Sequence, residues 1–138
     1  MKSQIRNFVI SAGFAALLST PILTAQTRLA VAEVPFDFTV GASSLPAGNY
    51  TVSSLGNLAG IVLRNDDTHK SIILASIARG DDKDKAVLAF RCYGDRCFLS
   101  EVDVPWSPAY IMTKGRLELE ASKTDTRATM AFVTMERR

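Results

Sequence analysis

The sequence predicts an all-β domain, an antiparallel sandwich or open barrel of about seven to eight short strands. Apolar residues alternate with polar residues over several short segments, which is the period of two that a half-buried strand requires. The pairs Gly56-Asn57 and Gly94-Asp95 separate some of these segments, as two-residue hairpin loops do. Polar loops separate the others, and the chain has no internal repeat.

The N-terminal segment has the order of a secretory signal peptide. Lys2 and Arg6 precede an apolar run over residues 7–23, and small residues follow up to Ala25. Polar residues and a proline interrupt this run, which leaves it short of the about 20 apolar residues that a membrane-spanning helix needs. We therefore predict a signal peptide over residues 1–25, with cleavage after Ala32 as the alternative. Residues 26–138 then form a single β domain that is periplasmic or extracellular, with no stable membrane insertion after signal cleavage.

The charge of the mature chain gives no reason to expect nucleic acid as a partner. The full chain of 138 residues contains 16 Lys and Arg and 14 Asp and Glu. The N-terminal segment holds two of the basic residues and no acidic residue, so the remaining chain is balanced at 14 against 14. A neutral domain with interspersed charges lacks the basic patch that binds a phosphate backbone. The expected partner is a protein or another envelope component.

Apolar residues at alternate positions predict the first strand over residues 34–40. Pro35 cannot donate a hydrogen bond to a neighbouring strand, which favours a position at a sheet edge. Residues 41–48, which contain a proline and two glycines, form a connecting loop.

A hairpin follows, with Gly56-Asn57 as its predicted loop. This register sets Val52 opposite Ile61 and Tyr50 opposite Leu63. Both pairs lie on one face of the hairpin, so the turn chemistry and the hydrophobic pattern agree.

The middle of the chain contains two further predicted strands. Residues 65–70 form a polar loop, and residues 71–79 are apolar on both faces, which is typical of a central strand covered on two sides. Residues 80–85 form a charged turn before the next strand over residues 86–92.

A cross-strand disulfide between Cys92 and Cys97 is predicted from hairpin geometry. With Gly94-Asp95 as the loop, Tyr93 and Arg96 form the pair beside it, and the cysteines form the next, non-hydrogen-bonded pair. The Cα atoms of such a pair lie within the range that a disulfide spans. Four residues separate the cysteines, not the two of thioredoxin-like sites, which favours a structural staple. The same register sets Phe90 opposite Leu99.

The strand after the second cysteine ends at Pro105-Trp106-Ser107-Pro108. Residues 109–128 are ambiguous: within them, residues 116–128 fit either a strand or a short polar helix. Residues 129–136 are apolar enough for a last strand.

The polar residues do not form a recognisable catalytic or metal-binding motif. His69 is the single histidine and lies in a polar loop, where a solvated role is expected. Asp66-Asp67 and the cluster of residues 81–84 lack the ligand spacing and turn glycine of a calcium loop, so ordinary turns are expected. We therefore predict no catalytic, cofactor-binding or metal-binding residues, no cofactor, and no enzymatic activity.

Three aromatic residues are the candidates for a binding surface. Tyr93, Trp106 and Tyr110 lie near turns, and Trp106 stands between two loop prolines. An exposed aromatic group there could contact a glycan or a protein, whereas the alternative role for Trp106 is a lid over one end of the core.

Two pairs of motifs carry a resemblance to known proteins. Val34-Pro-Phe-Asp-Phe-Thr-Val-Gly41 is followed by Leu45-Pro-Ala-Gly-Asn-Tyr-Thr-Val52, and Tyr93-Gly-Asp-Arg96 by Phe98-Leu-Ser-Glu-Val102. In these motifs the chain resembles a group of small exported proteins of unknown function from acidobacteria. The resemblance implies export and a bacterial source, and it carries no activity or binding residue to this chain. In that group other residues are expected where the two cysteines stand, so the disulfide would be a local addition.

The function that we expect from the sequence is that of an exported, non-catalytic envelope or extracellular module for interaction or structure. The first alternative is a small-ligand carrier, which would need an apolar cavity in a barrel and which a solid core would contradict. The second is an enzyme, which would need His69 or an acidic pair to converge in a cleft.

Overall fold

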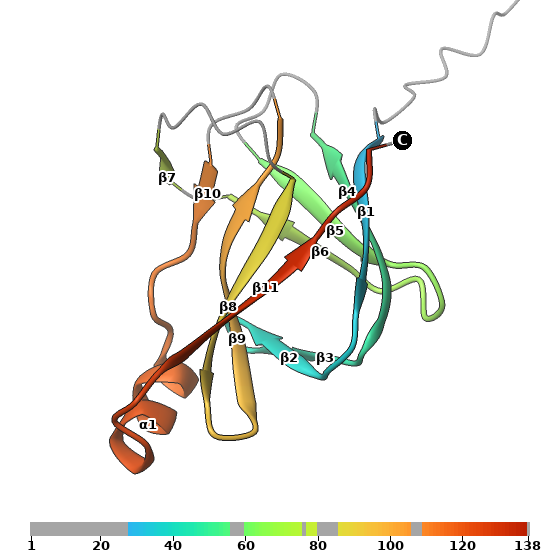
Figure 1. The fold of residues 1–138 in the computed structure, drawn as a ribbon. Coiled ribbons are helices and arrows are strands. Elements are labelled where there is room, and N and C mark those ends of the chain that lie inside the picture. The colour runs from blue at the N-terminus through green and yellow to red at the C-terminus, as the bar shows by residue number, and fades with distance from the viewer. Residues whose placement is uncertain (1–27, 56–59, 76, 80–85, 106–108, 138) are drawn as a thin grey trace, which may run out of the picture.

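The computed structural model describes residues 28–55, 60–75, 77–79, 86–105 and 109–137 (Figure 1). Within these ranges it contains eleven strands and one helix, and the strands form two sheets. The prediction of an all-β, sandwich-like domain is confirmed, and the described strands do not close into a barrel. The predicted signal peptide over residues 1–25, the loop Gly56-Asn57 and the charged turn over residues 80–85 lie outside the described residues.

The first sheet is antiparallel and has four strands in the order β1-β4-β5-β6. Its strands are β1 (Arg28–Val34), β4 (Gly48–Ser54), β5 (Ile61–Asn65) and β6 (Ser71–Leu74). A bridge between Val31 and Glu136 connects β1 to the C-terminal end of the chain, so the two sheets meet at this edge.

The second sheet has seven strands, and five of them follow the order β11-β8-β9-β10-β7. These five are β7 (Ile77–Arg79), β8 (Val87–Tyr93), β9 (Arg96–Asp103), β10 (Ala109–Ile111) and β11 (Thr129–Thr134). The short strand β2 (Phe38–Val40) pairs parallel with β9 and antiparallel with β3 (Ser43–Leu45). β3 lies within residues 41–48, so the prediction that this segment is only a loop is wrong.

The core lies between the two sheets and is filled by large side chains. The ring of Phe38 lies at the centre, with its centroid 5.2 Å from that of Tyr50 on β4 and 5.2 Å from that of Phe90 on β8. Both contacts are edge-to-face, the arrangement that aromatic rings prefer. The largest fully buried side chains include Tyr50, Phe38, Phe90, Ile61, Leu63 and Leu88. These side chains fill the described part of the core.

The strand predicted over residues 34–40 is two strands, and this prediction is wrong in that respect. Val34 ends β1 in the first sheet, and Phe38 begins β2 in the second. Pro35 lies between them, where its missing N–H removes no hydrogen bond from either sheet. Asp37 stabilises the crossing because its Oδ1 accepts a hydrogen bond from the backbone N–H of Ala47, at 2.8 Å. The alternation of apolar residues persists through the crossing, and Val34, Phe38 and Val40 are all buried.

The central strand predicted over residues 71–79 is also divided between the sheets. Its first part is β6, the edge strand of the first sheet, and its second part is β7, at the end of the second sheet. Apolar residues on both sides of this segment therefore reflect a chain that passes from one sheet to the other. They do not reflect a strand covered on both faces, since the side chain of Ile73 on β6 is 64% exposed.

The β4–β5 hairpin has a longer loop than predicted, and its register is shifted by two residues. Val52 lies opposite Leu63, and Tyr50 lies opposite Asn65, so the predicted pairs are wrong. The backbone N–H of Leu55 donates to the carbonyl of Gly60, which closes the hairpin at these two residues. A shift of two residues leaves every side chain on its predicted face.

The β8–β9 hairpin has the predicted register. Tyr93 lies opposite Arg96, and Phe90 lies opposite Leu99. Gly94 has a φ of +63°, the backbone conformation that the first residue of such a two-residue loop requires.

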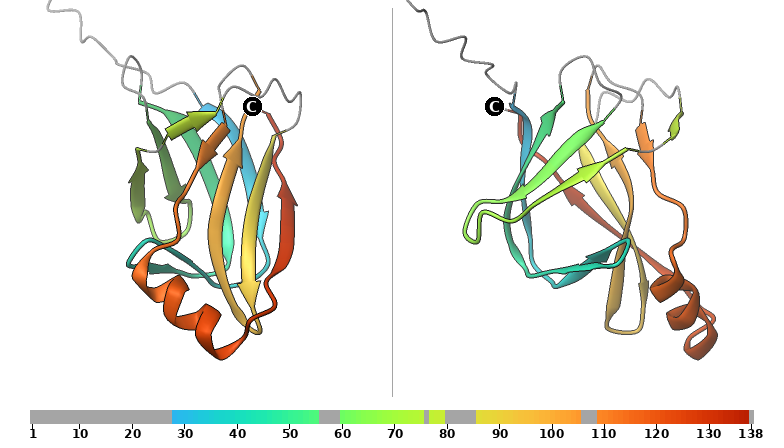
Figure 2. Two further views of the ribbon diagram at one scale, coloured as in Figure 1. Left: turned by 90° about the vertical axis from the view of Figure 1, so that its left-hand side faces the viewer. Right: turned by 180° about the vertical axis from the view of Figure 1, so that it is seen from behind.

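Helix α1 (Arg116–Thr124) resolves the ambiguity over residues 116–128. Leu117 and Ala121, four residues apart, pack with Tyr93 and Phe98 on the outer side of the β8–β9 hairpin. The helix lies beside the tip of this hairpin (Figure 2). The last strand, β11, is present as predicted.

Candidate functional site

The predicted disulfide is present. Cys92 and Cys97 are joined across the β8–β9 hairpin, with their Cα atoms 4.0 Å apart. They lie directly opposite each other, as the predicted register requires. The disulfide connects neighbouring strands near the hairpin tip and contributes to the core through Cys92, which is buried.

The three aromatic candidates do not form one exposed surface among the described residues. Tyr93 and Tyr110 are both buried. Tyr93 packs beneath α1, and Tyr110 belongs to the core between the sheets. Trp106 lies outside the described residues. The two tyrosines are therefore packing residues.

A buried ion pair fixes α1 to the second sheet. Glu118 on α1 accepts hydrogen bonds from Nε of Arg91 at 2.5 Å and from a terminal guanidinium nitrogen at 3.1 Å. The hydroxyl of Tyr93 donates to the same carboxylate at 3.1 Å. These contacts raise the pKa of Arg91, chiefly through the hydrogen bonds to Glu118. Because the carboxylate is fully engaged, this cluster is a structural connection.

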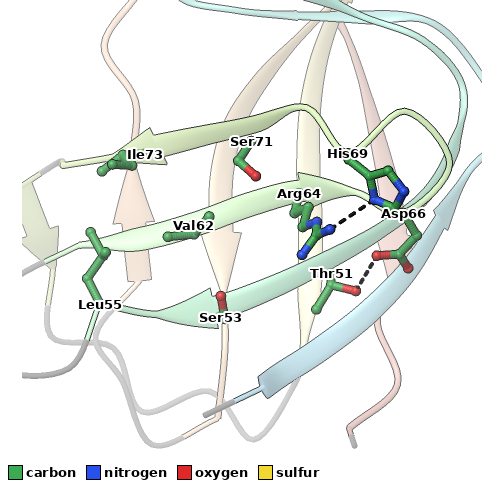
Figure 3. Close-up of a pocket in the computed structure, with 9 residues that line it drawn as sticks. All are labelled: Thr51, Ser53, Leu55, Val62, Arg64, Asp66, His69, Ser71 and Ile73. Carbon is green, nitrogen blue, oxygen red and sulfur yellow. Dashed lines mark hydrogen bonds between the residues drawn. The ribbon is translucent and has the colours of Figure 1, made fainter. Parts of the chain in front are cut away.

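A groove crosses the outer face of the first sheet, on the side opposite the core (Figure 3). It has a volume of about 760 Å³, which is within the range of small-molecule sites. The register of β4, β5 and β6 builds its floor from two rows of side chains. The first row is Thr51, Arg64 and Ser71, and the second is Ser53, Val62 and Ile73.

The two ends of the groove differ in polarity (Figure 3). Asp66 and His69 lie beyond the first row, where they make a charged end together with Arg64. Leu55 lies beyond the second row and makes an apolar end together with Val62 and Ile73. The groove is therefore amphipathic along its length.

The loop between β5 and β6 holds His69 at the charged end. Asn65 begins this loop, and its side-chain oxygen accepts hydrogen bonds from the backbone N–H groups of Asp67 and Thr68, at 2.9 and 2.8 Å. The backbone N–H of His69 donates to the carbonyl of Asn65 at 3.0 Å. His69 has a φ of +61°, an uncommon backbone conformation for a residue other than glycine. These hydrogen bonds hold the backbone of the loop, and with it His69, in this conformation.

Arg64 and His69 form a hydrogen bond of 2.9 Å between a guanidinium nitrogen and Nδ1 of the imidazole. Because a guanidinium only donates, Nδ1 is the acceptor, which assigns the imidazole proton to Nε2. Nearby, the hydroxyl of Thr51 donates to Oδ1 of Asp66 at 2.8 Å. Within the part of the chain that the structure describes, neither Arg64 nor Asp66 forms an ion pair. Arg64 therefore keeps a charge that no described carboxylate neutralises directly.

The described hydrogen bonds of the groove do not pair a hydroxyl nucleophile with the imidazole of His69. Nucleophilic catalysis needs a hydroxyl bonded to a base that a third group orients. The imidazole of His69 bonds to Arg64, and among the described residues no hydrogen bond joins it to a hydroxyl. The described residues also contain no group of three or more His, Cys, Asp or Glu side chains that could hold a metal ion.

Comparison with models of protein families, with curated proteins and with solved structures finds no match for this chain. No described helix is long and apolar enough to cross a membrane. The groove therefore has to be interpreted from its own residues.

Sequence reasoning missed the groove because it treated these residues separately. Asp66 and His69 were expected in a solvated turn, and both are indeed exposed there. The signal that could have found the site is the outward row of alternate residues on three successive strands. These outward residues form the two rows of the groove floor, which contain one arginine, three hydroxyl side chains and two aliphatic side chains.

Proposed function

We propose that this protein is an exported, non-catalytic binding module that holds an envelope component in the groove on the outer face of β4, β5 and β6. The observation that carries this proposal is the amphipathic floor of the groove. Its polar row, with Arg64 at the centre, lies next to a row that contains Val62 and Ile73. Arg64, which forms no ion pair with any described residue, lies there near Ile73, whose exposed aliphatic side chain gives the groove an apolar end.

Export is supported by the N-terminal segment and by the disulfide, because disulfides persist mainly in oxidising compartments. The structure also favours one of the two cleavage positions. Cleavage after Ala32 would remove most of β1, including the fully buried Ala30, and would leave β4 paired with β5 alone along most of its length. Cleavage after Ala25 leaves β1 complete, so the mature protein is proposed to begin at Gln26.

N-terminal sequencing of the exported protein tests this part of the proposal. The full chain, produced with its own N-terminal segment, should yield material that begins at Gln26. Material that begins at Met1 would contradict export. Material that begins at Glu33 would contradict the role of β1 in the mature fold.

Photocrosslinking in the cells that naturally produce the protein tests the groove. The photoreactive residue benzoylphenylalanine replaces Ile73 in one variant and Phe132 in the control. Ile73 is 64% exposed in the groove, and Phe132 is 67% exposed on β11, so the two positions are equally accessible. The proposal expects a discrete adduct at position 73 that is absent at position 132. Equal labelling at both positions, or no adduct at position 73, would contradict it.

The same crosslinking experiment identifies the kind of partner by mass. A small increase in mass indicates an envelope molecule, as proposed. An adduct with a whole protein would replace this proposal with that of a protein-interaction module.

A further inference from the structure

We infer that the ligand of the groove is a single-chain amphiphile with a monocarboxylate head, and this inference rests on the proposed function. The head lies at Arg64, and the aliphatic tail runs over Val62 and Ile73. The volume of about 760 Å³ accommodates a ligand of this size.

The head group is assigned from the hydrogen-bonding capacity of Arg64. A guanidinium has five N–H donors in a planar fork that matches the two oxygens of a carboxylate. The hydrogen bond to His69 engages one of the two terminal nitrogens. Ser71 lies directly opposite Arg64 on β6 and adds a hydroxyl donor at the same end of the groove. A carboxylate there gains a charged partner and a neutral donor.

The number of charges on the head is limited by Asp66. This carboxylate lies at the same end of the groove and is held in place by the hydroxyl of Thr51. A second negative charge on the ligand would be repelled by Asp66, and the described lining has no second Lys or Arg to offset this repulsion. The site therefore favours a monocarboxylate over a dianionic phosphate ester.

The tail is assigned from the apolar end. Val62 and Ile73 lie directly opposite each other on β5 and β6, and Leu55 continues this patch. An aliphatic chain over these residues would cover Ile73, which is otherwise 64% exposed. The described lining contains no Phe, Tyr or Trp side chain, so a nucleobase would lack a broad stacking surface.

Binding of octanoate, octanol and acetate to the exported protein, followed by amide NMR, tests this ligand class. Octanol keeps the tail without the charge, and acetate keeps the head without the tail. Octanoate should shift the amide signals of β4, β5 and β6 at low millimolar concentration. Octanol and acetate should each bind at least about tenfold more weakly, because each loses one of the two contacts.

Matched variants locate the head and the tail. Arg64→Gln should weaken octanoate binding about tenfold, and Lys70→Gln, which removes an exposed cation outside the groove, should change it less than about twofold. Ile73→Ser should weaken binding on the order of fivefold, and Phe132→Ser should not. Asp66→Asn keeps the acceptor for Thr51 but removes the repulsion, so it should tighten octanoate binding.

Several results would overturn the inference. Octanol that binds as tightly as octanoate would remove the role of the carboxylate, and equal effects of Arg64→Gln and Lys70→Gln would remove the specific contact. No shift with octanoate up to its solubility limit would exclude the ligand class. A groove adduct at position 73 in the crosslinking experiment would then still support the proposed function, so the two failures are distinguishable.

Discussion

Separating Glu118 from Arg91 should destabilise the domain more than any exposed ion pair can. The Glu118 side chain is 4% exposed and that of Arg91 is 20% exposed, so the pair is largely removed from water. Removing one partner of a fully buried pair costs about 3–5 kcal/mol. Because Arg91 is partly hydrated and keeps its hydrogen bond to the carbonyl of Met112 when Glu118 is removed, the cost of losing Glu118 is lower.

The two single substitutions should differ in a defined order. Arg91→Met leaves the more deeply buried carboxylate without its cation, and we expect a loss of about 3 kcal/mol in the free energy of unfolding. Glu118→Met leaves the partly hydrated guanidinium, and we expect about 2 kcal/mol. The double variant has no buried charge and should lose only about 2 kcal/mol, since the Tyr93 hydroxyl still lacks its acceptor. The coupling energy between the two sites is then about 3 kcal/mol.

Urea-induced unfolding followed by both circular dichroism and tryptophan fluorescence measures these values. The exposed pair Arg116–Glu120 on the same helix is the matched control, with side chains 91% and 50% exposed. Arg116→Met should change the free energy of unfolding by less than about 0.5 kcal/mol. If Arg91→Met costs no more than this control, or if the double variant costs the sum of the singles, the assignment of a buried, coupled pair is refuted.

Three further predictions concern the hairpin and the core. Replacing both Cys92 and Cys97 by alanine should cost about 2 kcal/mol in urea unfolding, because the disulfide closes only a short loop; a loss above about 4 kcal/mol would contradict this. Gly94→Ala should cost about 1 kcal/mol through its positive φ alone, since the nearest atom to an added Cβ is 3.8 Å away, and Gly94→Asn should cost less. Burial raises the pKa of Tyr50, so its contribution to stability is complete below about pH 10 and is lost as the pH rises through the raised folded-state pKa. Tyr50→Phe should therefore flatten the alkaline decrease in the free energy of unfolding, and an unchanged pH profile would exclude Tyr50 as its source.

The β8–β9 hairpin shows what local sequence can determine. Its loop has two residues, so the pairing of Cys92 with Cys97 follows by counting outward from Gly94. The only conformational requirement is a positive φ at a glycine, which the sequence supplies. Every contact in this prediction is made between residues close together in the chain, and all of it was confirmed.

The sheet to which each strand belongs could not be predicted from the local sequence. Residues 34–40 and 71–79 each keep an unbroken apolar pattern while the chain passes from one sheet to the other. Burial depends only on whether a side chain faces the shared core, and both sheets face the same core. The pattern therefore reports which side faces inward and contains no information about which neighbour forms the hydrogen bonds. That choice depends on contacts with distant strands such as β9 and β4.

The groove depends on the property that the sequence predicts least well, which is the pairing of residues across strands. The predicted β4–β5 register would have set Thr51 opposite Val62 and moved Arg64 next to Asn49, at the end of the strand. In the structure Thr51 lies opposite Arg64, and Arg64 lies opposite Ser71, so three polar residues form one row. Both registers bury the same residues, because they differ by two, and the core is insensitive to the choice. The outer face is sensitive to the choice of register, because a shift of two residues breaks up both rows. A site built on the outer face of a sheet therefore requires the exact register. The core requires only that any shift be an even number of residues, because such a shift keeps every side chain on its own face.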